Sequence, residues 1–268
     1  NSDEGAEARR PFIGFGDPAF NDEFESIDLD TRGRSRSLAV RALANTRKID
    51  SAVLADLPRL PETREEILTV AQILGANRDR DVYLGPDATE RKIKTLSEQG
   101  LLKQYRILAF ATHGLVPGDL DGLDRPALAL SQPSSTVNNL VDNGLLTSDE
   151  ILGLQLSADW AILSACNTGT VNSTGPDATS EMARAFFYAG AKSVLVSNWA
   201  VHSEATMILM TNLFQRYAKV GSISRANALQ EAMMQLVNNE SHAVDGQILF
   251  SYAHPLFWAP FAIIGDGR

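Results

Sequence analysis

Two side chains in this sequence of 268 residues are of types that could act together as a nucleophile and its base. Cys166 is the single cysteine, and His113 precedes it by 53 residues. A thiolate attacks carbonyl carbons, while an imidazole can take up the thiol proton and later protonate a leaving amine. The two residue types therefore predict a Cys–His hydrolase, provided that the fold brings them together.

Both residues follow apolar segments that are typical of strands buried on two faces. His113 follows the run 106–112, and Cys166 follows the run 160–164. A third such run, 193–197, ends in Ser197, Asn198 and Trp199. In open α/β sheets, ligands bind outside the carboxyl ends of the strands, so we expect these residues to line one crevice.

Small residues flank Cys166 on both sides. Ser164 and Ala165 precede it, and Thr168 and Gly169 follow. Their size would let a substrate approach the thiol closely, with Ser164 beside it. The backbone N–H groups of Cys166 and Gly114 could then stabilise the developing oxyanion.

The rest of the chain alternates apolar strand-like runs with helix-like segments, which indicates an α/β fold with a mostly parallel central sheet covered on both faces. We expect a flexible tail over 1–10 and one domain over 11–268, with long loops at 114–146 and 167–179. The segments 63–66 and 147–150 have the pattern of capping boxes at helix starts.

Charge and composition exclude several classes of protein. There are 33 acidic and 24 basic residues, a net charge of −9, which disfavours nucleic acid as a partner. No apolar run approaches the roughly 20 residues of a membrane span, and the charged first ten residues do not resemble a signal peptide.

Known cofactor and nucleophile motifs give further exclusions. One cysteine allows no internal disulfide, which fits a reducing, cytoplasmic setting, and four histidines with one cysteine disfavour a structural zinc site. No G-x-S-x-G elbow and no glycine-rich phosphate loop is present. We therefore expect no metal and no cofactor.

Several short motifs occur in the order found in one known family, and together they span about 11–266. They are FGDP (15–18), LGPDATE (84–90), FATHG (110–114), LLTSDEI (145–151), LSACNTG (163–169), ARAFFYAGA (183–191), SNW (197–199) and HP (254–255) with Trp258. In this ordered set the chain resembles the CHAT domain, a caspase-like cysteine peptidase of the caspase, separase and gingipain clan.

The resemblance implies a caspase-hemoglobinase-like three-layer sandwich and a dyad of His113, as general acid–base, and Cys166, as nucleophile. It also implies that Ser197, Asn198 and Trp199 line the substrate cleft. Asp17 would lie near the P1 side chain of a peptide substrate and favour a basic one. The alternative is that Asp17 only stabilises its Gly-Asp-Pro turn.

Three histidines lie outside the dyad, and of these we expect His254, which precedes a proline, to make a polar contact to loop backbone. His202 occupies a position where the resemblance leads us to expect an acidic residue, and it is either a surface residue or a substrate contact. His242 lies in a polar segment, and we expect it to be solvated.

Three functions remain open on the sequence. The first is an active cysteine endopeptidase that cleaves protein substrates and is regulated by a partner, such as a TPR-type protein, or by processing in its long loops. The second is a non-catalytic CHAT-like interaction module, which would be expected to lack a dyad residue. The third is another Cys-dependent α/β hydrolase.

Overall fold

A six-stranded sheet forms the centre of the computed structural model, which describes residues 9–20, 54–132, 142–164, 178–199, 202–219, 223–244 and 247–268. The strand order is β11-β8-β7-β3-β1-β2. Five neighbouring strands are parallel, and β11 at one edge runs antiparallel to β8. The strands are β1 (Arg10–Pro18), β2 (Val82–Gly85), β3 (Tyr105–Ala111), β7 (Trp160–Leu163), β8 (Ser193–Ser197) and β11 (Phe261–Gly265).

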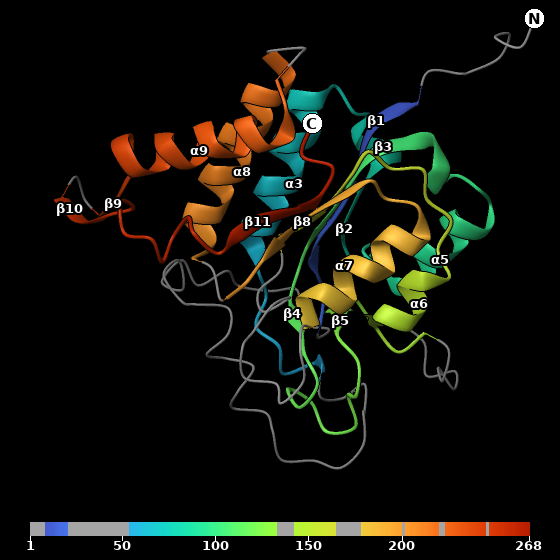
Figure 1. The fold of residues 1–268 in the computed structure, drawn as a ribbon. Coiled ribbons are helices and arrows are strands. Elements are labelled where there is room, and N and C mark those ends of the chain that lie inside the picture. Colours follow the sequence, from blue (N-terminus) through green and yellow to red (C-terminus); the bar gives the residue numbers. More distant parts are fainter. Residues whose placement is uncertain are drawn as a thin grey trace, which may run out of the picture.

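Helices cover both faces of this sheet, so the fold is the expected three-layer α/β arrangement (Figure 1). On one face lie α3 (Pro61–Leu74), α8 (Ser203–Lys219) and α9 (Arg225–Asn239). On the other lie α5 (Glu90–Glu98), α6 (Ser148–Leu152) and α7 (Ala178–Ala189). The short helices α4 (Arg78–Asp81) and η2 (Leu102–Gln104) lead into β2 and β3.

Successive residues of the central strands point into two different cores, which explains why the strands are apolar without alternation. Phe110 packs into the core under α5, α6 and α7, whereas its neighbour Ala109 packs into the core under α3, α8 and α9. In β7, Trp160 and Ile162 face the second core, and Ala161 and Leu163 face the first. The sheet is therefore buried on both sides.

The segment predicted as a loop over 114–146 is in part a second, small sheet, and that prediction was wrong there. Its strands are β4 (Gly114–Leu115), β5 (Ala127–Ala129) and β6 (Leu145–Thr147), and they pair antiparallel. β4 and β5 lie below the main sheet in Figure 1, beyond the end of β3. A third apolar cluster, which includes Phe20, Leu115 and Leu145, supports this sheet.

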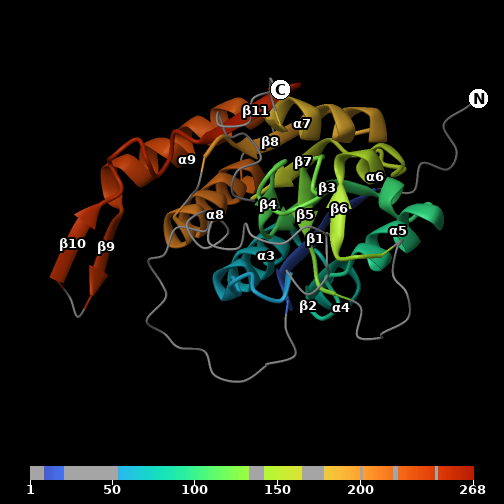
Figure 2. The same cartoon turned by 90° about the horizontal axis from the view of Figure 1, so that it is seen from below.

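A two-stranded hairpin of β9 (Ser241–Val244) and β10 (Gln247–Ser251) follows α9 and was not predicted. It projects away from the main sheet in Figure 2.

Of the two predicted capping boxes, one is confirmed. Thr147 caps α6, and Glu150 returns the reciprocal hydrogen bond. The other is wrong, because α3 begins at Pro61 and Thr63 lies inside its first turn. Proline suits the first helical position because its missing N–H would have no partner there.

Asp159 ties together the amino-terminal edge of the sheet, just before β7. Its carboxylate accepts hydrogen bonds from Arg9 Nη2 at 3.0 Å, Arg106 Nε at 2.9 Å and Lys192 Nζ at 2.9 Å. These residues precede or begin β1, β3 and β8. Arg9 and the first residue of β1, Arg10, thus belong to the fold, although the tail was predicted to extend to residue 10; residues 1–8 lie outside the described ranges.

Gly190 ends α7 with a φ of +113°, a conformation that residues with a Cβ rarely adopt. A Cβ at this position would lie 2.4 Å from the carbonyl oxygen of Leu156. We therefore expect Gly190→Ala to lower the free energy of unfolding by about 2 kcal/mol. Urea unfolding would measure this loss. Gly100→Ala, where φ is +69° but nothing lies within 4 Å, is the control and should cost less.

A buried carboxylic acid at the start of α5 gives the fold a pH dependence. Burial raises the pKa of Glu90 to about 7, and the negative charge of Glu150 adds to this, although Lys94 opposes it. Lys94 also bonds Glu150 at 2.7 Å and lies 3.8 Å from Asp142. Because the pKa of Glu90 is higher in the folded state than in the unfolded state, protonation of Glu90 stabilises the fold. This stabilisation is complete below about pH 4 and is lost as the pH rises through 7.

At pH 8, Glu90→Gln should therefore have a free energy of unfolding about 1 kcal/mol higher than that of the wild type, and it should unfold at a higher denaturant concentration. At pH 5 we expect no such gain. Unfolding titrations at both pH values measure this. Glu98→Gln, an exposed change on the same helix, should have no effect at either pH. A loss of stability in Glu90→Gln at pH 8 would contradict the assignment.

Within the described ranges, no helix is both long enough and apolar enough to cross a bilayer.

Candidate functional site

His113 lies two residues after the end of β3, at the carboxyl edge of the sheet, and its side chain is buried, with 1% of the residue exposed. Its Nε2 lies 2.8 Å from the carbonyl oxygen of Pro58. Because a carbonyl only accepts hydrogen bonds, Nε2 carries the proton and Nδ1 is the basic nitrogen. The ring is therefore held in the tautomer that can take up a proton at Nδ1.

The small sheet fixes the backbone on either side of this ring. The Thr112 hydroxyl donates to the Ala129 carbonyl, and the Ala129 N–H donates to the His113 carbonyl at 2.9 Å. This second bond makes Gly114 and Leu128 a non-hydrogen-bonded pair of the antiparallel ladder. The Gly114 N–H is thus not used by the β4–β5 pairing, which suits the oxyanion role predicted for it.

An apolar support lies beside the His113 ring. The ring of Phe20 is tilted against it, with 5.5 Å between the ring centroids. Phe20 is itself buried in the third apolar cluster. Neither this contact nor that with the Pro58 carbonyl was predictable from the sequence, because nothing in the local pattern connects residues as distant as His113 and Pro58, which are 55 positions apart.

Cys166, the predicted nucleophile, lies outside the described residues. The register of the strand before it, β7, relates the two predicted dyad residues. Phe110 of β3 pairs with Leu163 of β7. His113 is three residues after Phe110 in the sequence, and Cys166 is three residues after Leu163. Ser164, the residue predicted to lie beside the substrate, directly follows β7 and is buried.

Asp17 lies at the end of β1 and is fully buried. Its carboxylate accepts from Arg59 Nη2 at 2.8 and 2.9 Å and from Arg64 Nε at 2.8 Å. Its N–H donates to the Thr63 hydroxyl at 2.8 Å, and its φ is +47°. The carboxylate thus already has two cationic partners, whereas the predicted basic-P1 role needs it to face a substrate.

The residues that follow β8 bond to the segment before β11. Asn198 donates to the Pro260 carbonyl through both its backbone N–H, at 2.9 Å, and its side-chain amide, at 3.1 Å. The Trp199 indole N–H donates to the Leu256 carbonyl at 3.3 Å, and 37% of this residue is exposed. Ser197, the last residue of β8, is buried. The cleft-lining role predicted for this segment remains a prediction.

His202 and His242 meet in an aromatic cluster between the start of α8 and the hairpin. Five rings pack together in this cluster, those of His202, His242, Phe250, Tyr252 and Phe257. The ring centroids of His242 and Phe250 are 4.9 Å apart, and those of His202 and Phe257 are 5.6 Å apart.

The expectation that His242 is solvated was wrong. Its Nδ1 lies 2.6 Å from Glu204 Oε2, and 16% of its side chain is exposed. His202 Nδ1 accepts from the Ala205 N–H at 3.4 Å, which supports a packing and capping role at the start of α8.

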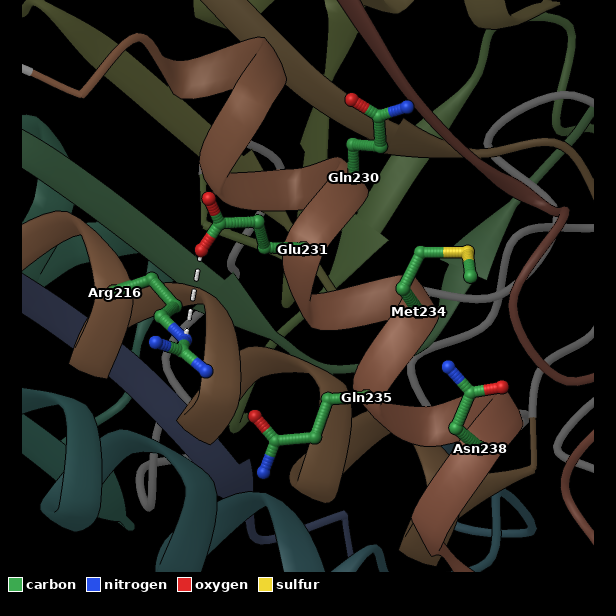
Figure 3. A pocket seen from close by; sticks show the side chains of 6 residues that line it. All are labelled: Arg216, Gln230, Glu231, Met234, Gln235 and Asn238. Carbon is green, nitrogen blue, oxygen red and sulfur yellow. Dashed lines mark ion pairs between the residues drawn. The ribbon is translucent and has the colours of Figure 1, made fainter.

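A surface depression of about 560 Å³ opens over α8 and α9 (Figure 3). Arg216 of α8 and Glu231 of α9 form an ion pair across it at 3.6 Å. It is lined by Arg216, Gln230, Glu231, Met234, Gln235 and Asn238. None of these is a predicted site residue, and the depression lies on helices that cover one face of the sheet rather than at its carboxyl edge.

No group of three or more His, Cys, Asp and Glu side chains suited to a metal ion occurs among the residues that the structure describes.

Comparison with known proteins gives one family and a few relatives. A family model described as CHAT domain matches residues 2–266. Tetratricopeptide repeat protein 28 of Mus musculus is 24% identical over 259 residues, and that of Homo sapiens is 26% identical over 262 residues. Each match covers 87% of this chain and 10% of the relative, so the chain spans about a tenth of the length of these curated relatives.

One solved structure that aligns with the chain is that of the Arg-specific cysteine proteinase gingipain R. The TM-score is 0.47 at 11% sequence identity, and the alignment covers 76% of this chain and 42% of the other.

Proposed function

Because the chain belongs to the CHAT domain family and is thus a caspase-like, protease-related domain, we propose that it is a cysteine endopeptidase with a dyad of His113 and Cys166. One observation carries this proposal. The buried His113 is held by the Pro58 carbonyl with Nδ1 as its basic nitrogen, at the carboxyl edge of the strand that pairs with the strand before Cys166.

In the proposed acylation, Nδ1 of His113 takes the proton of the Cys166 thiol. The thiolate sulfur forms a bond to the carbonyl carbon of the peptide, and the C–N bond then breaks. The imidazolium gives its proton to the departing amine, which leaves a thioester on Cys166. The Pro58 carbonyl oxygen accepts a hydrogen bond from Nε2 in both protonation states of His113, and its partial negative charge stabilises the imidazolium.

Deacylation repeats these steps with water. His113 takes a proton from the water, and the hydroxide oxygen bonds to the thioester carbon. The carbon–sulfur bond then breaks, the imidazolium gives its proton to the sulfur to restore the thiol, and the acyl part of the substrate leaves as a carboxylic acid. In both tetrahedral intermediates we assign the oxyanion to the N–H groups of Gly114 and Cys166. The substrate is a protein or peptide, and Ser164, Ser197, Asn198 and Trp199 are the proposed contacts.

We also propose a regulatory partner of the TPR type. The two curated relatives are named as tetratricopeptide repeat proteins, and this domain makes up a tenth of their length. No nucleic acid or membrane enters the proposed function.

Alkylation of the single cysteine tests the dyad without knowledge of the substrate. Iodoacetamide is reacted with the folded protein across pH, as the wild type and as His113→Ala, and the rate is followed by intact mass. An unperturbed thiol titrates at about pH 8.5, and a neighbouring imidazolium lowers this midpoint. We expect a lowered midpoint in the wild type that returns toward ~8.5 in His113→Ala.

A wild-type midpoint that equals that of His113→Ala would refute the dyad. The chain would then fit the interaction module left open by the sequence.

A further inference from the structure

The segment that presents its carbonyl to His113 is fixed to β1 by one residue. Pro58, whose carbonyl lies 2.8 Å from His113 Nε2, is followed directly by Arg59. The Arg59 guanidinium bonds both carboxylate oxygens of Asp17 through Nη2. We propose that Asp17 is a positioning residue, which holds the Pro58 carbonyl, and through it His113, in the geometry that the reaction needs; this inference rests on the proposed function.

A second set of contacts starts from the backbone of the same residue. The Asp17 N–H donates to the Thr63 hydroxyl at 2.8 Å, and this hydroxyl donates to the Leu60 carbonyl at 2.6 Å. Arg64 Nε adds a further bond to the carboxylate at 2.8 Å. Residues 59, 60, 63 and 64 are thus all connected to Asp17, directly or through one hydroxyl, and Pro58 is the next residue in the chain.

The burial and backbone conformation of Asp17 argue for this role over direct substrate contact. The residue is fully buried, and two arginines already bond its carboxylate. Its φ of +47° is an uncommon conformation for a residue with a Cβ, and such conformations persist only where the surrounding contacts hold them. A P1 side chain would have to displace one of the arginines to reach the carboxylate.

The consequence for His113 follows from its buried ring. If the segment 58–64 shifts, the Nε2–H group loses its hydrogen-bond acceptor. Water cannot replace that acceptor, because His113 is only 1% exposed. The buried ring can then lower its energy by rotating or by moving its proton to Nδ1. Either change removes the basic nitrogen from its position, and a displacement of about 1 Å can lower the rate by up to about 100-fold.

The tautomer of His113 can be read directly by NMR, because the sequence contains only four histidines. The whole chain, labelled with ¹⁵N in histidine, is recorded in long-range ¹H–¹⁵N spectra near pH 8, and His113→Ala assigns the signal. We expect the Nε2–H pattern for His113 in the wild type. In Asp17→Asn we expect a second population, with the proton on Nδ1 or an averaged signal.

Asp81→Asn is a matched control. Asp81 is also a buried aspartate with an arginine partner, since Arg80 bonds its two oxygens at 2.7 and 2.9 Å, and it accepts a backbone N–H from Asn77. It lies before β2, at the opposite edge of the sheet from His113. Asp81→Asn should lower stability as Asp17→Asn does but leave the His113 signal unchanged.

Should Asp17→Asn fail to fold, Arg59→Gln breaks the same connection and leaves the Asp17–Arg64 pair in place. An unchanged His113 signal in the folded variants, or an equal change in Asp81→Asn, would overturn the positioning role. This readout needs neither turnover nor Cys166, so it is separate from failure of the proposed peptidase activity.

Peptide cleavage distinguishes the two roles of Asp17. As a positioning residue it should affect kcat for every peptide, by about 10-fold or more, with KM changed little. A loss confined to peptides with Arg or Lys at P1, together with an intact His113 signal, would return Asp17 to substrate recognition and overturn the proposal.

Discussion

Cys166→Ala is expected to abolish peptide cleavage, and His113→Ala to lower it by at least about 1,000-fold in kcat/KM, because each removes one half of a unit that acts together. Without the thiol no thioester forms, and without the imidazole nothing takes the thiol proton or protonates the amine. Cleavage of a peptide library, analysed by mass spectrometry of the products, measures both losses.

The double variant Cys166→Ala, His113→Ala should be no worse than Cys166→Ala alone, since residues of one catalytic unit are not additive. His254→Ala is a useful control, because His254 lies in an exposed turn where its Nδ1 accepts from the Leu256 N–H. Wild-type turnover in either single dyad variant would refute the assignment of that residue.

Asp159→Ala is expected to cost about 3 kcal/mol of the free energy of unfolding. The change leaves Arg9, Arg106 and Lys192 without their shared carboxylate, and removal of one partner from a buried ion pair typically costs about 3–5 kcal/mol. The lower end applies because these cations are 34%, 52% and 59% exposed, so water compensates part of the loss. Urea unfolding at pH 7 measures the difference.

This effect has a defined pH dependence. Burial alone would raise the pKa of Asp159, but hydrogen bonds from Lys192, Arg106 and Arg9 outweigh it and hold that pKa well below its ordinary value. The contribution is therefore complete above the unfolded pKa of about 3.9 and is lost as the pH falls below it.

The difference in the free energy of unfolding between the wild type and Asp159→Ala should thus become smaller as the pH is lowered from about 4 to about 2. Glu231→Ala removes an exposed pair with Arg216 and should cost less than about 1 kcal/mol at pH 7. Equal losses in the two variants would contradict the central position given to Asp159.

The main sheet was predictable because each of its strands carries a signal that does not depend on its partners. The run 106–112 was expected as a strand and forms β3 (Tyr105–Ala111), and 193–197 forms β8. Apolar side chains at successive positions are needed wherever both faces are covered. The position of His113 at the end of β3 followed from that pattern alone.

The small sheet and the contacts of Asp17 were not predictable in this way. β4 and β5 have two and three residues, too few to show a period, and they lie among glycines and aspartates that are typical of loops. Asp17 bonds residues 42 and 47 positions away, and no local pattern reports such a distance. The family resemblance suggested substrate recognition for Asp17 and the Gly-Asp-Pro motif suggested a turn, whereas the structure shows ion pairs with Arg59 and Arg64.

The antiparallel direction of β11 has a practical consequence for handling the protein. Gly265 lies opposite Ser193, the first residue of β8, so the chain leaves the sheet at the edge where β1 begins with Arg10. Asp266 bonds the Lys192 carbonyl at that edge. An affinity handle, a fluorescent reporter or a linker to a solid support joined at Arg268 would therefore extend away from His113, and immobilised protein would still present its carboxyl edge to dissolved peptides.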